Sequence, residues 1–213
     1  MVLLSRRTLL ATACLSAGSL PLFGRLANGA APATELTLTP APARYPLTGA
    51  GVTEAMMSYS PDAPPPVLRL KQGQPARILV RNGLEEVTTV HWHGLRIPFA
   101  QDGVPWLTQV PIGAGESHVY EFTPPDAGTY WYHPHCNTLD QIARGLAGVL
   151  IVDEADPPGF DADLPLLLRD FRLGKDGQFI AFTSPRNMAR GGTLGTLSTV
   201  NWTINPALDA PAG

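Results

Sequence analysis

The chain has 213 residues and a formal net charge of −3 at pH 7, and 44% of its residues are hydrophobic while 15% are charged. This balance excludes a strongly basic nucleic-acid-binding protein and supplies enough apolar side chains for a core. The 22 prolines and 21 glycines are too few for a collagen-like or fully disordered chain. They favour a turn-rich, all-β protein.

Residues 1–33 have the features of an export signal in the expected order. Ser5-Arg6-Arg7-Thr8-Leu9-Leu10 is a twin-arginine signature, and Ala31-Pro32-Ala33 resembles a cleavage site. The apolar run between them is shorter than the about 20 residues that span a bilayer. We therefore predict a twin-arginine signal segment over 1–33, no membrane span and a periplasmic location. An ordinary N-terminal helix with two basic residues is the alternative interpretation.

From residue 34 the sequence predicts short strands separated by turns. Strands are predicted over 35–39, 67–71, 75–82, 87–95, 116–123, 128–135 and 148–153, with one or two helical turns over 138–144. Short strands at this spacing are typical of a β-sandwich or barrel. We predict an N-terminal domain over residues 34–156.

The last part of the chain, residues 157–213, predicts a linker and the incomplete start of a second domain. Apolar residues 164–171 predict a strand, and the turn at 175–178 predicts a hairpin that returns through 179–182. A polar, glycine-rich segment over 184–196 precedes one more predicted strand, 198–205.

Two short stretches, His91-Trp92-His93 and His133-Pro134-His135, hold four of the five histidines. Side chains two residues apart on a strand face the same side, roughly 6.5–7 Å apart. That spacing is wide for two ligands of one metal ion and suits ligands of neighbouring ions. Two such strands side by side would place four imidazoles around one pocket.

The aromatic neighbours of these histidines predict core packing. We expect Trp92, Trp131 and Tyr132 to point to the face opposite the histidines and to stiffen the strands. The fifth histidine, His118, has no partner at two-residue spacing. We expect it at a strand surface or the edge of the core, and not as a metal ligand.

The stretch from about Leu36 to Phe182 resembles the N-terminal cupredoxin domain of the multicopper oxidases, the laccase-like enzymes. The resemblance rests on several motifs, namely His91-Trp92-His93-Gly94-Leu95, Asp102-Gly103-Val104-Pro105 and Thr129-Tyr130-Trp131-Tyr132-His133-Pro134-His135, followed by Gln141, Gly145-Leu146 and Gly148. It implies a cupredoxin-like Greek-key β-sandwich or barrel, with the start of a second cupredoxin domain.

In that family, His-x-His motifs from the first and last domains together hold a trinuclear copper cluster that reduces dioxygen to water. The resemblance implies that His91 binds the type-2 copper, His93 and His133 bind one type-3 copper, and His135 binds the other. The residue types also favour copper, because imidazole is a good copper ligand and divalent copper has the highest affinity for nitrogen sites among the divalent first-row metals.

Asp102 is the candidate catalytic residue. In the family an acid at this place lies near the cluster and helps to supply protons for oxygen reduction. The alternative is a turn aspartate, because Asp102-Gly103 is a turn pair.

Cys136 directly follows His135, which raises the question of a type-1 blue-copper site. Such a site needs a cysteine and two histidines, often with an axial methionine. At the positions where the cupredoxin pattern has its histidine and methionine, this chain has Gln141 and Leu146. We therefore predict that Cys136 is a buried structural thiol. Because Cys14 belongs to the signal segment, we expect no disulfide in the mature chain.

The chain departs from the family pattern in its second half. No histidine follows His135, so the other cluster ligands and the type-1 site are absent, and Trp106 and Trp202 stand where glycine is common. We expect the front part of a longer oxidase, which would use dioxygen and an unknown reductant when completed by missing domains. The alternative is a stand-alone periplasmic copper-binding module that buffers copper or pairs with another chain. A third interpretation, a zinc hydrolase, is disfavoured because no carboxylate or third histidine follows the His-x-His motifs at zinc-site spacing.

Overall fold

The computed structural model describes residues 32–208 except 50, 62, 190 and 191, and these residues belong to one compact unit. The twin-arginine motif and Cys14 lie outside the described residues, so the export signal stays a prediction. Within the described part of the chain, no helix is long and apolar enough to cross a membrane.

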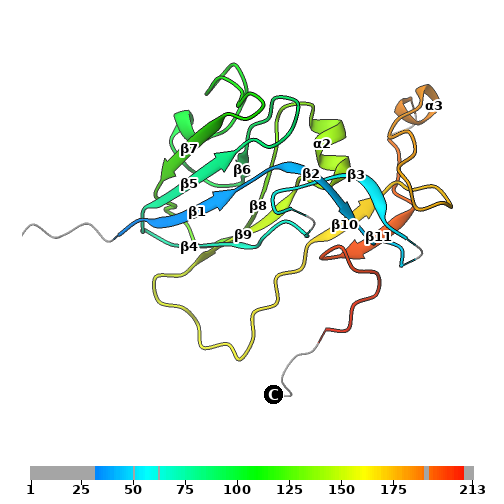
Figure 1. Cartoon of the computed structure of the whole chain (residues 1–213). Coiled ribbons are helices and arrows are strands. Elements are labelled where there is room, and N and C mark those ends of the chain that lie inside the picture. The colour runs from blue at the N-terminus through cyan, green and yellow to red at the C-terminus, as the bar shows by residue number, and fades with distance from the viewer. Residues whose placement is uncertain (1–31, 50, 62, 190–191, 209–213) are drawn as a thin grey trace, which may run out of the picture. The chain divides into compact units, whose positions relative to one another are not determined.

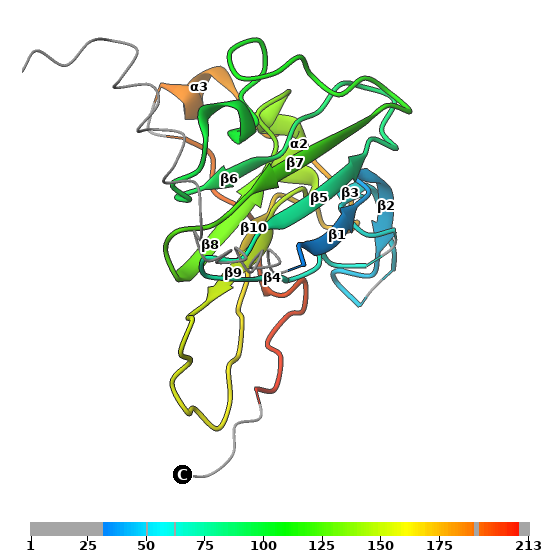
Figure 2. The same cartoon turned by 90° about the vertical axis from the view of Figure 1, so that its left-hand side faces the viewer.

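Two sheets form the main body of the unit, which is mostly β as predicted. The first consists of β1 (Thr34–Leu38), β5 (Ala76–Arg81) and β7 (Ser117–Phe122), with β1 parallel and β7 antiparallel to the central β5. The second consists, in spatial order, of β4 (Leu68–Lys71), β9 (Gly148–Asp153), β8 (Gly128–His133) and β6 (His91–His93). Figure 1 and Figure 2 show the two sheets from perpendicular directions.

The alternating sequence of the strands explains the core between these sheets. In β5, Ala76, Ile78 and Val80 are buried while the residues between them are more exposed. Leu150 and Val152 of β9 belong to the same hydrophobic cluster. Because apolar residues two apart share one face of a strand, each sheet presents a continuous apolar surface to the other.

A smaller cluster joins two strand pairs that are far apart in the sequence. The hairpin of β2 (Ala41–Tyr45) and β3 (Thr53–Ser58) packs against the pair β10 (Leu168–Phe171) and β11 (Leu197–Val200), as Figure 1 shows. Its buried members include Phe171 and Trp202. The boundary predicted at residue 156 separates these strands in sequence, and it stays a prediction.

Several predicted elements differ from the structure. The sequence missed β2 and β3, and the predicted strand 87–95 is shortened to β6, with η1 (Phe99–Gln101) in the following loop. Residues 164–167 and 179–182 are not strands, and the last strand covers 197–200 and not 198–205. The helix α2 (Thr138–Arg144) lies where predicted, and a short helix α3 (Pro185–Met188) occupies part of the polar segment. Short pairings such as β2–β3 depend on packing more than on alternation.

Trp106 and Trp202 both adopt a left-handed backbone conformation. Trp106 has a φ of 65° and Trp202 a φ of 64°. Bulky residues rarely adopt this conformation. Trp202 is 1% exposed and contacts the rings of Phe171 and Tyr45, whereas Trp106 is 79% exposed. Burial therefore offsets the backbone strain at Trp202 but not at Trp106.

Candidate metal centre

Strands β6 and β8 bring the two histidine motifs together. In their antiparallel register His91 pairs with His133, Trp92 pairs with Tyr132, and His93 pairs with Trp131. Cross-strand partners on one face have neighbouring side chains. Trp92 and Tyr132 are fully buried in the core, as the sequence predicts, so His91, His93 and His133 share the opposite face.

The four rings predicted to meet do so. The ring centroids of His91 lie 5.6 Å from His93, 5.3 Å from His133 and 4.4 Å from His135. His135 lies beyond the end of β8, and its ring stacks on that of His133 at 5.1 Å. The bend after β8 therefore returns His135 to the cluster.

Three of these histidines have ligand atoms close enough to hold one metal ion. The ligand nitrogens of His91, His93 and His133 lie within 4.8 Å of one another. Nδ1 of His93 and Nε2 of His133 are 3.2 Å apart. Imidazole nitrogens bind zinc at about 2.0–2.1 Å, so two ligands at a tetrahedral angle lie about 3.3 Å apart. The donor set and this spacing fit a metal bound by imidazoles.

Hydrogen bonds fix the orientation of two of the rings. Nδ1 of His91 donates to the backbone carbonyl of Asp102 at 2.7 Å, and Nδ1 of His133 lies 3.0 Å from the carbonyl of Pro134. A ligand histidine commonly donates its other ring N–H in this way. With Nδ1 occupied, each ring presents Nε2 for metal binding.

Asp102 is placed beside His91 by a tight backbone contact. Its carboxylate Oδ1 lies 3.4 Å from Nδ1 of His91, and its side chain is 34% exposed. Gly103 follows with a φ of 74°, and a Cβ there would overlap the carbonyl oxygen of Val90. Glycine therefore lets the Asp102 loop lie against the backbone that leads into β6.

Burial keeps the buried histidines in the neutral form that binds metals. It lowers the pKa of His133 to about 4, although the hydrogen bond to Pro134 opposes the shift. Burial also lowers the pKa of His135, with a further contribution from the nearby His91. Protons therefore compete weakly for these two rings near neutral pH.

Two hydroxyl groups anchor the ends of the histidine segments. The backbone N–H of Val90 donates to the hydroxyl of Tyr120 at 3.0 Å, and the N–H of His135 donates to Oγ1 of Thr89 at 3.2 Å. Both hydroxyl contacts lie next to the ligand residues in sequence or in space. The predicted edge residue His118 packs on Tyr120 at 4.6 Å and is not part of the three-histidine group.

Cys136 is a free thiol that is 7% exposed, which confirms the predicted burial. Burial raises the pKa of this thiol. Gln141 is also fully buried, where it accepts a hydrogen bond from the Thr88 hydroxyl and donates one to the Val87 carbonyl. The glutamine thus ties α2 to the segment before β6.

The prediction for Trp131 was wrong. Its indole lies on the histidine side, stacked on His93 with centroids 4.7 Å apart and on His133 with centroids 4.0 Å apart. Trp131 precedes His133 by two residues, so the strand period places both on one face. The same counting applied to the sequence would have found this contact.

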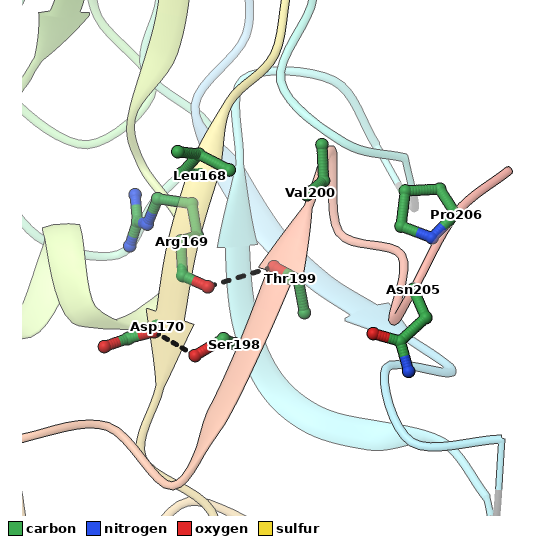
Figure 3. Close-up of a pocket in the computed structure, with 8 residues that line it drawn as sticks. All are labelled: Leu168, Arg169, Asp170, Ser198, Thr199, Val200, Asn205 and Pro206. Atoms are coloured by element: carbon green, nitrogen blue, oxygen red, sulfur yellow. Dashed lines mark hydrogen bonds between the residues drawn. The ribbon is translucent and has the colours of Figure 1, made fainter. Parts of the chain in front are cut away.

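Two hollows lie beside the strand pair β10–β11. A cavity of about 620 Å³ is lined by Trp131, by residues 167–170, and by Thr138, Leu139, Ile142, Ala143 and Ala147 in and after α2. Another, of about 570 Å³, lies over β10 and β11, where the Thr199 hydroxyl donates to the Arg169 carbonyl and Ser198 bonds Asp170 (Figure 3). Arg169 itself donates to the carbonyl of Ile142 at the end of α2.

Comparison with known proteins identifies the family of this chain. The family model described as multicopper oxidase matches residues 44–157, more than half of the chain. This chain belongs to the multicopper oxidase family. Its fold is that of the cupredoxin domains in its structural neighbours, and family membership implies copper as the metal of the site.

Individual relatives agree. The chain is 36% identical over 164 residues to a multicopper oxidase of Mycobacterium tuberculosis, covering 75% of this chain and 32% of the relative. It is 35% identical to copper resistance protein A of Escherichia coli over 134 residues, covering 57% of this chain and 22% of that protein. The crystal structure of a multicopper oxidase from Pseudomonas thermotolerans is 42% identical and superposes with a TM-score of 0.83 over 86% of this chain and 44% of that one. The chain thus spans less than half of these relatives.

Proposed function

We propose that this chain is the copper-binding N-terminal part of a laccase-like multicopper oxidase. It contributes half the ligands of a trinuclear copper cluster that couples oxidation of a reductant to reduction of dioxygen to water. The observation that carries the proposal is the convergence of His91, His93, His133 and His135 at one end of the β6–β8 pair. The matching family supports it.

The family resemblance implies individual ligand roles, and the spacing of the rings supports them. His93 and His133 are proposed to share one type-3 copper, because their facing nitrogens are 3.2 Å apart. His91, whose Nδ1 is held by Asp102, is proposed for the type-2 copper. His135 lies outside the three-histidine group but beside His91, which supports a role at the other type-3 copper.

Bound copper would pass electrons from the reductant to dioxygen. The residues of this chain orient the ligands, keep His133 and His135 neutral through burial, and offer a proton route. Asp102 is the proposed proton donor, since its carboxylate is partly exposed and lies 3.4 Å from a ligand ring. A carboxyl group in this position is able to exchange protons with solvent on one side and serve the cluster on the other.

Replacing Asp102 with Asn in a longer oxidase that contains this chain should slow dioxygen reduction while leaving copper content intact. The His91 hydrogen bond uses the backbone carbonyl of Asp102, so the substitution spares it. We expect about a 10²–10⁴-fold loss, the usual contribution of a general acid. Oxygen consumption and bound copper are the measurements, and unchanged oxygen consumption would exclude the role.

The cellular location and domain organisation are proposals of the same kind. A twin-arginine signal over 1–33 would export the chain to the periplasm. A cupredoxin domain over 34–156 would then be followed by a linker and the start of a second domain over 157–213. The packing of β10 and β11 on the β2–β3 hairpin is compatible with a second domain that begins against the first.

Copper(II) titration of the full chain tests the proposed function. We expect the His93→Gln and His133→Gln variants to bind copper at least about tenfold more weakly, because each loses one ligand of a shared ion. The control is His118→Gln, which removes a histidine outside the three-histidine group. If all three variants bind copper as tightly as the unaltered chain, the proposed site is wrong.

A further inference from the structure

Trp131 makes contacts that the ligand set alone does not explain. Its indole lies nearly parallel to the imidazoles of His93 and His133, with interplanar angles of 29° and 26°. The register of β6 and β8 places Trp131 directly opposite His93, and the strand period places it beside His133. One side chain therefore touches both rings whose nitrogens are 3.2 Å apart.

His93 is the ligand most in need of such support. The side chain of His93 is exposed, and its ring is hydrogen-bonded to the ring of His133. His91 and His133, in contrast, have backbone carbonyls that hold their Nδ1 atoms. An exposed imidazole turns freely unless something restrains its side-chain torsions. Stacking on Trp131 supplies that restraint.

The indole belongs to an inner strand of the sheet, because β8 lies between β9 and β6. It is partly buried on β8, and it forms one wall of the cavity between α2 and β10. Stacked aromatic rings attract each other by more than the burial of their surface alone provides. A partly buried ring in the middle of a sheet is thus able to restrain a more exposed one at the edge strand.

We propose that Trp131 is a positioning residue that holds His93 and His133 with Nδ1 of one and Nε2 of the other aimed at a single copper ion. The inference rests on the proposed function for the identity of the metal. Groups that orient metal ligands typically change metal affinity by about 10–100-fold when they are removed. We expect a change of this size from loss of the indole.

Copper(II) titration of the full chain and of three variants tests the effect on affinity. Trp131→Leu should weaken binding about tenfold or more and alter the electron paramagnetic resonance spectrum of bound copper. Trp131→Phe retains a stacking ring and should keep most of the affinity. Trp106→Leu is the matched control, because Trp106 is 79% exposed. If Trp131→Leu binds copper with the affinity and spectrum of the unaltered chain, the proposal is overturned.

A copper-free measurement separates this proposal from the proposed function. The indole ring current should shift the ring-proton NMR signals of His93 and His133, and Trp131→Leu should reverse those shifts without moving the signals of His118. Unchanged signals would overturn the positioning role whether or not copper binds. Reversed shifts in a chain that binds no copper would support the positioning role and reject the proposed function.

Discussion

The two hydrophobic clusters of this molecule differ in what they support. The larger one lies between the β1–β5–β7 sheet and the β4–β9–β8–β6 sheet, and it includes Trp92 and Tyr132 from the histidine-bearing strands. The smaller one joins β2–β3 to β10–β11 around Trp202. The histidines proposed as ligands therefore depend directly on the larger cluster, because its members Trp92 and Tyr132 alternate in sequence with His91, His93 and His133.

At two glycines the backbone lies so close to a side chain of a hydrophobic cluster that a Cβ would not fit. A Cβ at Gly148 would overlap the ring of Tyr132, which fills the larger cluster. At Gly145, just after α2, a Cβ would overlap the carbonyl of Met57 and press on the Trp202 ring. The segment 145–148 thus packs against both clusters, which is one physical connection between them.

The largest effects should come from emptying each cluster of its tryptophan. Trp92→Ala and Trp202→Ala each remove a fully buried ring, and each should lower the free energy of unfolding by about 3–5 kcal/mol. Only Trp92 lies between two ligand histidines, so we expect copper affinity to fall in that variant and to persist in folded Trp202→Ala. Chemical denaturation and copper titration below the unfolding transition measure the two effects. Equal loss of copper affinity in both would contradict the comparison.

A pair of glycine variants should show how far the metal centre depends on close backbone approach at its edge. Gly103 and Gly115 have nearly the same φ, 74° and 75°. A Cβ has open space at Gly115 but overlaps Val90 at Gly103. Gly115→Ala should cost about 1–2 kcal/mol from left-handed strain alone. Gly103→Ala should cost more and also weaken copper binding, because the loop must leave His91. Copper affinity equal to that of Gly115→Ala would contradict this account.

Substitution by glycine should change the stability of the fold in opposite directions at the two left-handed tryptophans. Trp106→Gly should stabilise the fold by up to about 1 kcal/mol, since it relieves backbone strain at a side chain that is 79% exposed. Trp202→Gly relieves the same strain but empties the smaller cluster, and it should destabilise the fold. Thermal unfolding of both variants is the measurement. A destabilised Trp106→Gly variant would show that the exposed ring has contacts worth more than the strain.

The smallest effect concerns pH. Burial lowers the pKa of His118, so the folded chain binds a proton there less readily than the unfolded chain, whose histidines titrate near pH 6.5. This group therefore costs stability as pH falls through that value. His118→Gln should lose less stability between pH 7 and pH 5, by no more than the about 0.5 kcal/mol typical of sites away from the core. An identical pH dependence in the variant would exclude the contribution.

Alternation in the sequence was enough to predict most of the larger cluster. The segments 76–81, 117–122 and 148–153 read as strands because their apolar residues recur at the period that one buried face demands. The strands β2 and β3 were missed, because a short hairpin such as Ala41–Tyr45 and Thr53–Ser58 is fixed by packing against distant residues. Local pattern carries little information about such partners.

The amino-acid sequence was enough to predict that four histidines occupy two strand-like motifs and face one pocket. It also determined the family resemblance and the burial of Cys136. The tertiary contacts add which nitrogens face each other and that the backbone carbonyl of Asp102 holds His91. The strand period already puts Trp131 on the histidine side, and the tertiary structure adds that its indole stacks on both His93 and His133. The physical reason is that strand period fixes the side of a sheet, whereas cross-strand register and loop return fix the neighbours on that side.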